Sequence, residues 1–371
     1  MSKKTFVTPV AVSIVLAALV FCIAKTGTEN PNKKFSEKEI SAYLEKDLDS
    51  SEKSLGITKE ARKSFVLHHG LVSYEIGIST APYVVLSCTN AASPVKDSDL
   101  EAFGDKYRID TFQIKSSLRD EHPIPADYIT NGDYGKNTVI MVHGCGENRR
   151  KMPERAKMFL ENGWNVLQYD QRSSGQNTAP FVTYGVAEQY DLFDCVQYVN
   201  EKTEGKAKIA LFGSSMGCLT VCKMLSDNYM ASYVSCAILD SPLTSLETMI
   251  LPELRKNCPK DILPIAEDSF NRFTKVFYGF TFEDVNLRYF GQDITTPVLV
   301  FVTEKDDILN YADQKKAISS IPEGNKHVYT SKECGHCGFY REHHDDYVDL
   351  CMKLLDGKLV QQSQTGGAYE F

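Results

Sequence analysis

The chain has 371 residues, of which 42% are hydrophobic, so it is long enough to bury a sizeable core in one large domain or two ordinary ones. Its 49 acidic residues outnumber its 41 basic residues, which sets the formal net charge at −8, and no basic block interrupts the sequence. This pattern argues against a nucleic-acid-binding surface.

The first segment of the chain is predicted to be a membrane anchor. Two lysines precede an uncharged apolar run at residues 6–24, and Lys25 closes it. Roughly 20 apolar residues span a bilayer as a helix. Because basic residues before such a helix stay in the cytoplasm, residues 1–25 are expected to hold the remaining chain outside the cytoplasmic membrane. The alternative is a signal peptide cleaved after Ala24, which would leave a secreted protein.

The cysteine content fits awkwardly with export. The chain carries eleven cysteines, and their spacing does not indicate a small disulfide-linked scaffold. Several lie in apolar settings and are predicted to be small core residues: Cys195, Cys218, Cys222, Cys236 and Cys351.

Residues 26–104 are predicted to form a partly helical extension before the main domain. Residues 35–69 mix charged residues with spaced apolar ones, which is typical of one or two surface helices. Residues 71–94 are apolar but irregular, and their sequence indicates no role. At the other end of the chain, residues 358–371 are polar and are predicted to be a disordered tail.

Residues 105–357 are predicted to be a single α/β domain. Strands are expected at 107–114, 126–130, 138–142, 165–169, 209–212, 235–239, 298–303 and 327–330. Helices are expected at 149–162, 186–202, 218–228, 311–320 and 341–355. Apolar strands alternating with helices indicate a mostly parallel, doubly wound sheet that is covered on both faces. The interval 243–296, after the sixth strand, is rich in aromatic residues and is predicted to be a helical lid.

The most informative motif is Gly-x-Ser-x-Gly at residues 213–217. It follows an apolar strand directly and opens a helix. Glycine has no Cβ, so the flanking positions tolerate the sharp turn that projects the hydroxyl of Ser215. The pattern predicts a nucleophile elbow, and such a serine needs a base within hydrogen-bonding reach.

Downstream residues supply a base and an acid. His336 is the favoured base among the eight histidines, because it lies in a loop of small residues after the last strand and before a helix. Several acidic residues follow the strand at 298–303, and Asp306 and Asp307 are the candidates to orient the histidine. The alternative for either aspartate is to cap the helix that begins near residue 310.

These motifs, in this order, resemble the α/β-hydrolase superfamily over about residues 105–357. His143-Gly144 is similar to the family's His-Gly turn, and the Asp-x-Arg-x-x-Gly pattern at residues 170–175 is similar to the turn after its next strand. The resemblance includes bacterial peptidase-like and esterase-like members that are membrane-anchored or secreted. It implies the order serine, acid, histidine, favours Asp306 over Asp307, and places the oxyanion hole at the backbone N–H groups of Met216 and Cys145. An amide donor leaves the side chain at position 145 weakly constrained, so Cys145 needs no redox role.

Three alternatives concern the residues around His336. Cys334-Gly-His-Cys337 matches the Cys-x-x-Cys of disulfide isomerases, although its position near the carboxy terminus suits a reversible disulfide beside His336 better. A metal site is the second alternative, formed by Cys334, His336, Cys337, His343 and His344. The third is a binding protein without activity on the same fold.

The sequence therefore predicts a serine hydrolase that cleaves a small-molecule acyl compound and needs no metal or organic cofactor. Ser215, Asp306 and His336 are the expected catalytic residues. Carboxylic esters are favoured over peptides, with a serine peptidase or aminopeptidase-like enzyme as the alternative. The aromatic lid indicates an apolar or aromatic acyl group, with packing of the lid against the body of the domain as the alternative role of the same residues.

Overall fold

The computed structural model describes residues 35–85, 94–248, 263–359 and 369–370. The chain divides into a helical unit, drawn from residues 1–87 and 247–284, and an α/β unit, drawn from residues 88–246 and 285–371. The predicted membrane segment at 1–25 lies outside the described residues. Within the described ranges, no helix is both long enough and apolar enough to cross a membrane.

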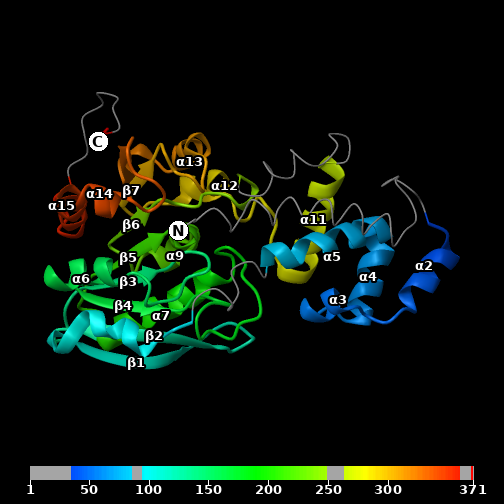
Figure 1. The fold of residues 1–371 in the computed structure, drawn as a ribbon, viewed down its shortest axis with the longest axis horizontal. Helices are drawn as coiled ribbons and strands as arrows, with labels where there is room; N and C mark the ends of the chain where they lie inside the picture. The colour runs from blue at the N-terminus through cyan, green and yellow to red at the C-terminus, as the bar shows by residue number, and fades with distance from the viewer. Residues whose placement is uncertain (1–34, 86–93, 249–262, 360–368, 371) are drawn as a thin grey trace. The chain divides into compact units, whose positions relative to one another are not determined.

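A nine-stranded sheet forms the centre of the α/β unit (Figure 1). Its order is β1-β2-β4-β3-β5-β6-β7-β8-β9; β1 and β2 are antiparallel to their neighbours, and every other pairing is parallel. The strands are β1 (Arg108–Lys115), β2 (Pro123–Thr130), β3 (Thr138–Val142), β4 (Asn165–Tyr169), β5 (Ile209–Ser214), β6 (Cys236–Asp240), β7 (Val298–Thr303), β8 (Lys326–Ser331) and β9 (Tyr369–Glu370). The prediction of a mostly parallel α/β sheet is confirmed.

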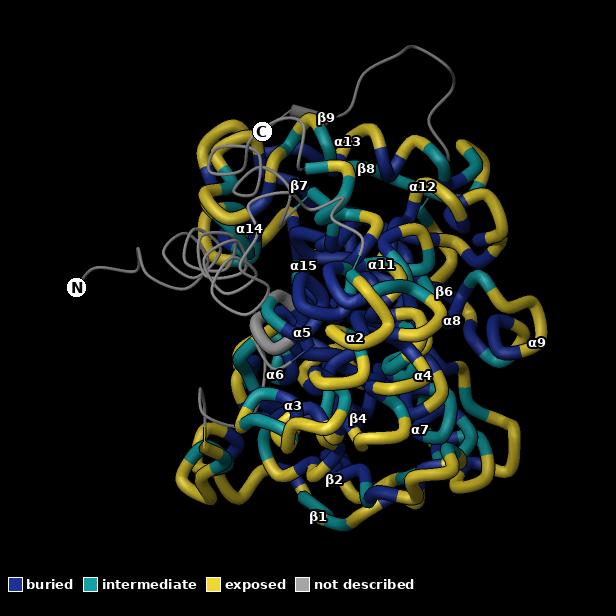
Figure 2. Tube along the Cα trace, turned by 90° about the vertical axis from the view of Figure 1, so that its right-hand side faces the viewer, coloured by how far each residue is buried: buried dark blue, intermediate teal, exposed yellow. Residues whose placement is uncertain are grey.

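Every residue of β3, β4, β5, β6 and β7 is buried, as expected for strands with near-continuous apolar sequences. Figure 2 draws buried residues in dark blue. The register of these strands brings the ends of neighbouring strands to one edge: Val142 of β3 lies opposite Gly213 of β5, and Ser214 of β5 lies opposite Asp240 of β6. Loops that leave these carboxyl ends therefore meet one another, which is where open α/β sheets bind their ligands.

Helices cover both faces of the sheet. The α/β unit contains α6 (Pro153–Glu161), α7 (Glu188–Lys202), α8 (Met216–Leu225), α9 (Asn228–Ala231), α12 (Leu287–Phe290), α13 (Tyr311–Ile318), α14 (Phe339–Glu342), α15 (His344–Leu355) and the 3₁₀ helices η1 (Asp97–Lys106), η2 (Gly291–Asp293) and η3 (Glu323–Asn325). One face carries α6 and α15, whose Phe159 and Tyr347 belong to a core cluster with Met141, Phe212 and Phe301 of the strands. Helices α7 and α8 contact β3 and β5 and each other outside this cluster, which places them on the other face.

The helical unit joins two segments that are far apart in the sequence. It contains α2 (Glu37–Leu44), α3 (Ser50–Ser54), α4 (Lys59–His69), α5 (Leu71–Val85) and α11 (Leu263–Tyr278). Helix α11, from the insertion predicted to be a lid, packs against α5 from the amino-terminal extension. A Cβ at Gly77 of α5 would lie 2.3 Å from the ring of Phe273, so only glycine allows this close approach. Within the apolar stretch that had no expected role, residues 71–85 thus form the helix against which α11 packs.

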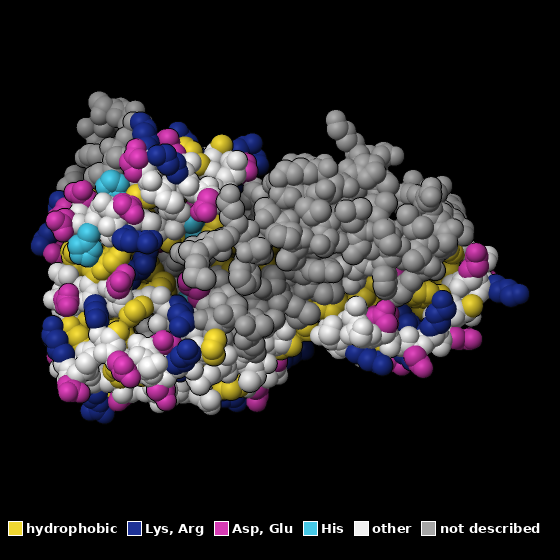
Figure 3. All heavy atoms as spheres, viewed as in Figure 1, with side chains coloured by type: hydrophobic (Ala, Val, Ile, Leu, Met, Phe, Trp, Pro, Cys, Tyr) yellow, Lys and Arg dark blue, Asp and Glu magenta, His cyan; other side chains and the backbone are white. Residues whose placement is uncertain are grey.

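The last described residues, 369–370, form β9, whose Tyr369 pairs with Tyr329 of β8. On the face of the α/β unit drawn in Figure 3, basic side chains are interspersed with acidic ones, in keeping with the mixed charge of the sequence.

Candidate active site

The structure places Ser215 at a sharp turn between β5 and α8. Its φ of 51° and ψ of −114° lie outside the regions that a serine ordinarily adopts. Three main-chain hydrogen bonds hold the turn: Ser215 N–H donates to Asp240 O at 2.9 Å, and Ser215 O accepts from Leu243 N at 3.0 Å and from Cys218 N at 3.1 Å. A strained residue fixed by its surroundings is typical of a functional position.

The two glycines of the motif are required by close contacts. A Cβ at Gly213 would lie 2.8 Å from the Cα of Cys218, and a Cβ at Gly217 would lie 2.2 Å from the carbonyl oxygen of Val142. Both obstacles are main-chain atoms, which cannot move aside as a flexible side chain does. The Gly-x-Ser-x-Gly pattern therefore allows α8 to begin directly against the end of β3.

The structure brings His336 and Asp306 to this serine. The Nε2 atom of His336 lies 2.9 Å from Ser215 Oγ, and its Nδ1 atom lies 2.8 Å from Asp306 Oδ2. A carboxylate only accepts, so Nδ1 carries a hydrogen and Nε2 of the neutral ring is left to accept from the serine hydroxyl. Of the two aspartates considered, it is Asp306 that reaches the histidine.

Asp306 is itself fixed at the start of the loop after β7. Its Oδ1 accepts hydrogen bonds from the backbone N–H groups of Ile308 at 2.9 Å and Leu309 at 2.8 Å. Its side chain has no exposed area, and that of His336 is 12% exposed. With one carboxylate oxygen bound to the backbone and the other to His336, Asp306 can set the orientation of the ring.

The pKa of His336 is raised above its ordinary value of 6.5. Burial by itself disfavours the charged imidazolium, but the hydrogen bond to Asp306 and the neighbouring side chain of Cys337 outweigh it. A base must be neutral to accept a proton. The raised pKa of His336 therefore favours chemistry at higher pH than an unperturbed histidine would give.

The loop after β3 lies beside the serine. A Cβ at Gly144 would lie 3.4 Å from both Ser215 Cβ and Glu147 Oε2, and Gly144 N–H donates to that carboxylate at 3.2 Å. His143 Nε2 accepts from Gln171 N at 3.1 Å, and Nδ1 donates to Gly144 O at 2.8 Å. His143 thus ties the His-Gly turn to the turn after β4.

Cys145 differs from its prediction. We expected its side chain to be weakly constrained, but it is disulfide-bonded. The other cysteines within the described ranges are free: Cys195, Cys218, Cys222, Cys236, Cys334, Cys337 and Cys351. The five cysteines predicted to be core residues are all buried, as expected.

The two cysteines around His336 are not joined to each other. Cys334 is buried and its thiol donates to Ser331 Oγ at 3.0 Å, whereas the Sγ atom of Cys337 lies 3.4 Å from Ser214 Oγ. His343 binds Ser331 Oγ through Nε2 at 3.0 Å. The described part of the chain contains no group of three or more His, Cys, Asp or Glu side chains that could hold a metal ion, so the alternative metal site finds no support.

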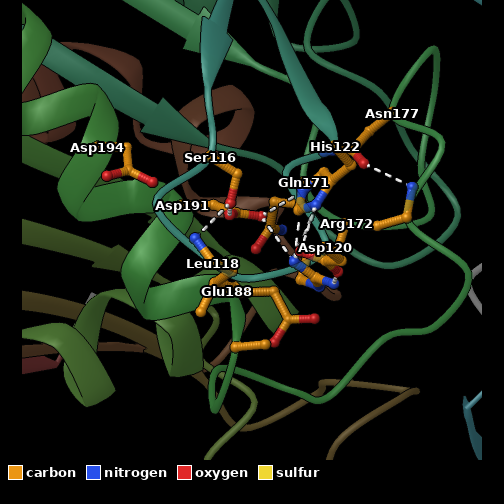
Figure 4. Close-up of polar contacts among 12 residues, drawn as sticks. Ser116, Leu118, Asp120, His122, Gln171, Arg172, Asn177, Glu188, Asp191 and Asp194 are labelled. Atoms are coloured by element: carbon orange, nitrogen blue, oxygen red, sulfur yellow. Dashed lines mark hydrogen bonds and ion pairs between the residues drawn. The ribbon is translucent and has the colours of Figure 1, made fainter.

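The Asp-x-Arg-x-x-Gly turn contributes to a largely buried network of charges, in which Asp120 is the exposed member (Figure 4). Arg172 forms ion pairs with Asp120 and with Asp191, at 3.5 Å in the second case. His122 lies between the same carboxylates, with Nδ1 3.0 Å from Asp120 and Nε2 3.0 Å from Asp191. At the end of the turn, a Cβ on Gly175 would lie 2.4 Å from the Asp170 carboxylate. The resemblance identified this turn, but the sequence did not indicate His122 as part of it.

Sequence reasoning also missed Arg155 and Asp240. Asp240 ends β6 and is fully buried, and Arg155 of α6 donates to its Oδ2 from Nε at 3.1 Å and from Nη2 at 3.0 Å. The one sequence signal that could have indicated Asp240 is its position as a charged residue directly after the strand predicted at 235–239. Nothing in the sequence pairs it with Arg155.

The sheet, the serine turn and the order of its partners define an α/β hydrolase, and comparisons with known proteins agree. A model of the serine aminopeptidase S33 family matches residues 134–274. An esterase of Pyrococcus furiosus has a similar fold, with a TM-score of 0.56, 20% identity, and coverage of 72% of this chain and 97% of its own. These similarities show that the chain has the α/β-hydrolase fold.

Two curated proteins are similar in sequence. The uncharacterized protein YqkD of Bacillus subtilis is 28% identical over 223 residues, which cover 59% of this chain and 71% of that protein. The monoglyceride lipase of Saccharomyces cerevisiae is 30% identical over 108 residues, which cover 27% of this chain and 34% of the lipase.

Proposed function

We propose that this protein is a serine hydrolase that cleaves carboxylic esters through Ser215, His336 and Asp306. The observation that carries the proposal is the continuous hydrogen-bonded chain from Ser215 Oγ to His336 Nε2 at 2.9 Å and from His336 Nδ1 to Asp306 Oδ2 at 2.8 Å. A serine hydroxyl with a base in contact, and a third group that orients the base, is the arrangement that nucleophilic acyl transfer requires.

The proposed reaction has two steps. His336 Nε2 takes the proton from Ser215 as its oxygen attacks the ester carbonyl, and the imidazolium then protonates the departing alcohol. Water attacks the resulting acyl-enzyme with His336 again as base, which releases the acid and restores the serine. Asp306 stabilises the imidazolium in both steps through its contact with Nδ1.

The oxyanion would be held by the backbone N–H groups of Met216 and Cys145. Met216 is the first residue of α8, so its N–H lies at the positive end of the helix. Gly144, the neighbour of Cys145, closely approaches Ser215. One such donor contributes about 3 kcal/mol to the stabilisation of the transition state.

A fluorophosphonate probe tests this proposal directly. The wild-type protein should be labelled and should hydrolyse chromogenic esters, and Ser215→Ala should abolish both. Labelling that persists in Ser215→Ala would place the nucleophile elsewhere, and a wild-type protein that neither reacts nor turns over would favour the binding-protein alternative.

A second candidate is an aminoacyl hydrolase, and Glu147 is the observation that favours it. Its carboxylate and Ser215 flank Gly144. A carboxylate in this position would attract a protonated amine next to the scissile carbonyl. If the substrate is an aminoacyl compound, Glu147→Gln should slow the hydrolysis of aminoacyl esters and amides and leave the hydrolysis of neutral esters unchanged. Equal effects on both substrate classes would support the simple ester.

We also propose that the enzyme works outside the cytoplasm, anchored by residues 1–25 or secreted after their cleavage. The disulfide at Cys145 supports this location, because disulfides persist mainly in oxidising compartments. Membrane fractionation, followed by protease treatment of intact cells, distinguishes an outward-facing anchored protein from a secreted one. Complete protection from protease in intact cells would contradict both.

A further inference from the structure

We propose that Arg155 is a positioning residue that ties the His336 loop to the serine turn, an inference that rests on the proposed function. Arg155 belongs to α6 and touches neither Ser215, Asp306 nor His336 in any of its hydrogen bonds. Its guanidinium instead joins the two main-chain segments on which the serine and the histidine are carried.

The first connection runs through Asp240 to the serine turn. Arg155 pairs with Asp240 Oδ2, and Asp240 O accepts from Ser215 N–H at 2.9 Å. Tyr347 of α15 also donates to the Asp240 carboxylate, at 3.1 Å. The exposed fraction of the side chain is 14% for Arg155 and zero for Asp240, so the pair is largely screened from water. A guanidinium and a carboxylate held in this way define a rigid point next to the nucleophile.

The second connection runs to the residue after His336. Arg155 Nη2 donates to Cys337 O at 2.9 Å, and Cys337 N–H donates to Ser241 Oγ at 2.9 Å. Both polar main-chain groups of Cys337 are therefore held by residues outside its loop. Cys337 has a φ of 52°, a conformation that costs energy for a residue other than glycine and persists only where its surroundings impose it.

These two connections meet on one guanidinium. Without it, Cys337 O would lose its partner, and the only main-chain group of Cys337 still bound by a residue outside its loop would be the N–H that donates to Ser241. The ring of His336 would then sample positions farther from Ser215 Oγ than the 2.9 Å of this structure. Because an error of about 1 Å in a reacting pair lowers rates by up to about 10²-fold, we expect the role to appear in kcat and not in KM.

Three variants of Arg155, to Met, Lys and Ala, and one control variant test its role in the full chain. Arg155→Met removes both connections, and Arg155→Lys keeps the charge but loses the fork of donors that reaches two acceptors. The matched control is Arg150→Met. Arg150 is also a buried, ion-paired arginine, but its partners are Asp127 and Asp97. Thermal unfolding reports stability, and the fluorophosphonate labelling rate together with kcat and KM for a chromogenic ester reports the site.

The expected result is a fall in kcat and in labelling rate of about 10- to 100-fold for Arg155→Met, with KM little changed. Arg155→Lys should fall between this variant and the wild type. Added guanidinium ion should restore part of the activity of Arg155→Ala. Arg150→Met should lose stability but keep its labelling rate when folded. A folded Arg155→Met with wild-type kcat, or an Arg150→Met equally impaired in kcat, would overturn the proposal.

Ser241→Ala keeps the proposal testable if the arginine variants do not fold. It removes the other hydrogen bond to Cys337 without leaving a buried charge unpaired. A lower kcat supports the proposal that hydrogen bonds to the main chain of Cys337 position His336, and an unchanged kcat in the folded protein contradicts it. A wild-type protein that lacks fluorophosphonate reactivity would instead contradict the proposed function, so the two failures are distinguishable.

Discussion

Gly217→Ala should damage the proposed site far more than it damages the fold. A Cβ at this position would lie 2.2 Å from Val142 O and 2.7 Å from His143 O. Ordinary contact begins at 3.4 Å, so the first of these pairs must separate by 3.4 − 2.2 = 1.2 Å. The displaced atoms belong to the end of β3 and to the first residue of the loop that carries Cys145.

The expected magnitudes follow from this displacement. In a helix without such a contact, alanine is more favourable than glycine by about 0.8–1 kcal/mol. Overpacking of a buried site costs about 1–3 kcal/mol, so the two effects partly cancel in the free energy of unfolding. No favourable effect of alanine offsets the displacement in the rate of catalysis. A shift of about 1 Å between the serine and an oxyanion donor lowers the rate by about 10²-fold.

The assay pairs the fluorophosphonate labelling rate with denaturant unfolding. Gly135→Ala is the matched control, because its new Cβ would meet only the end of a flexible side chain, Asp133 Oδ1 at 3.2 Å. We expect Gly217→Ala to label about 10²-fold more slowly with a modest loss of stability, and Gly135→Ala to match the wild type in labelling. If Gly217→Ala labels at the wild-type rate, the close packing of α8 against β3 does not set the geometry of the site.

Three further predictions concern charge and redox state. Asp306→Asn removes the carboxylate that raises the pKa of His336. The acid limb of the pH profile of kcat/KM should therefore move to lower pH, and kcat should fall by roughly 10²-fold or more. An acid limb that does not move would contradict the pairing of Asp306 with His336. Burial disfavours the charged form of His122, but the contact with Asp191 outweighs burial and raises the pKa of His122 in the folded protein. Protonated His122 therefore stabilises the fold fully at pH values below the pKa of the unfolded chain. This stabilisation is lost as the pH rises through the pKa of the folded protein. The difference in unfolding free energy between the wild type and His122→Gln should therefore be largest in acid and shrink towards alkaline pH; a difference that grows with pH would be inconsistent with an imidazolium. Reduction of the Cys145 disulfide should lower the free energy of unfolding of the wild type by about 2–4 kcal/mol, and so lower its unfolding temperature. Reductant should leave the unfolding temperature of Cys145→Ser unchanged. An equal response of both proteins would mean that a different disulfide is being reduced.

The sequence by itself determined the α/β fold and the candidate residues of the site. The strands at 138–142, 165–169 and 298–303 were predicted with the bounds that the structure has, because a fully buried strand needs an uninterrupted apolar run. The helix predicted at 341–355 was less accurate, since it is two helices with a break at His343. Ser215 was identifiable because a strand, a tight turn and a helix within a few residues leave a local pattern.

Tertiary structure decided what depends on distant partners. The pairing of α5 with α11 joins segments with no shared periodicity, and it rests on a glycine that meets Phe273 across the interface. Arg155 lies 85 positions before Asp240 and 182 before Cys337, so no local pattern connects them. A sequence reports local propensity and apolar spacing, whereas ion pairs and main-chain contacts between distant segments exist only once the sheet has brought the ends of its strands to a common edge.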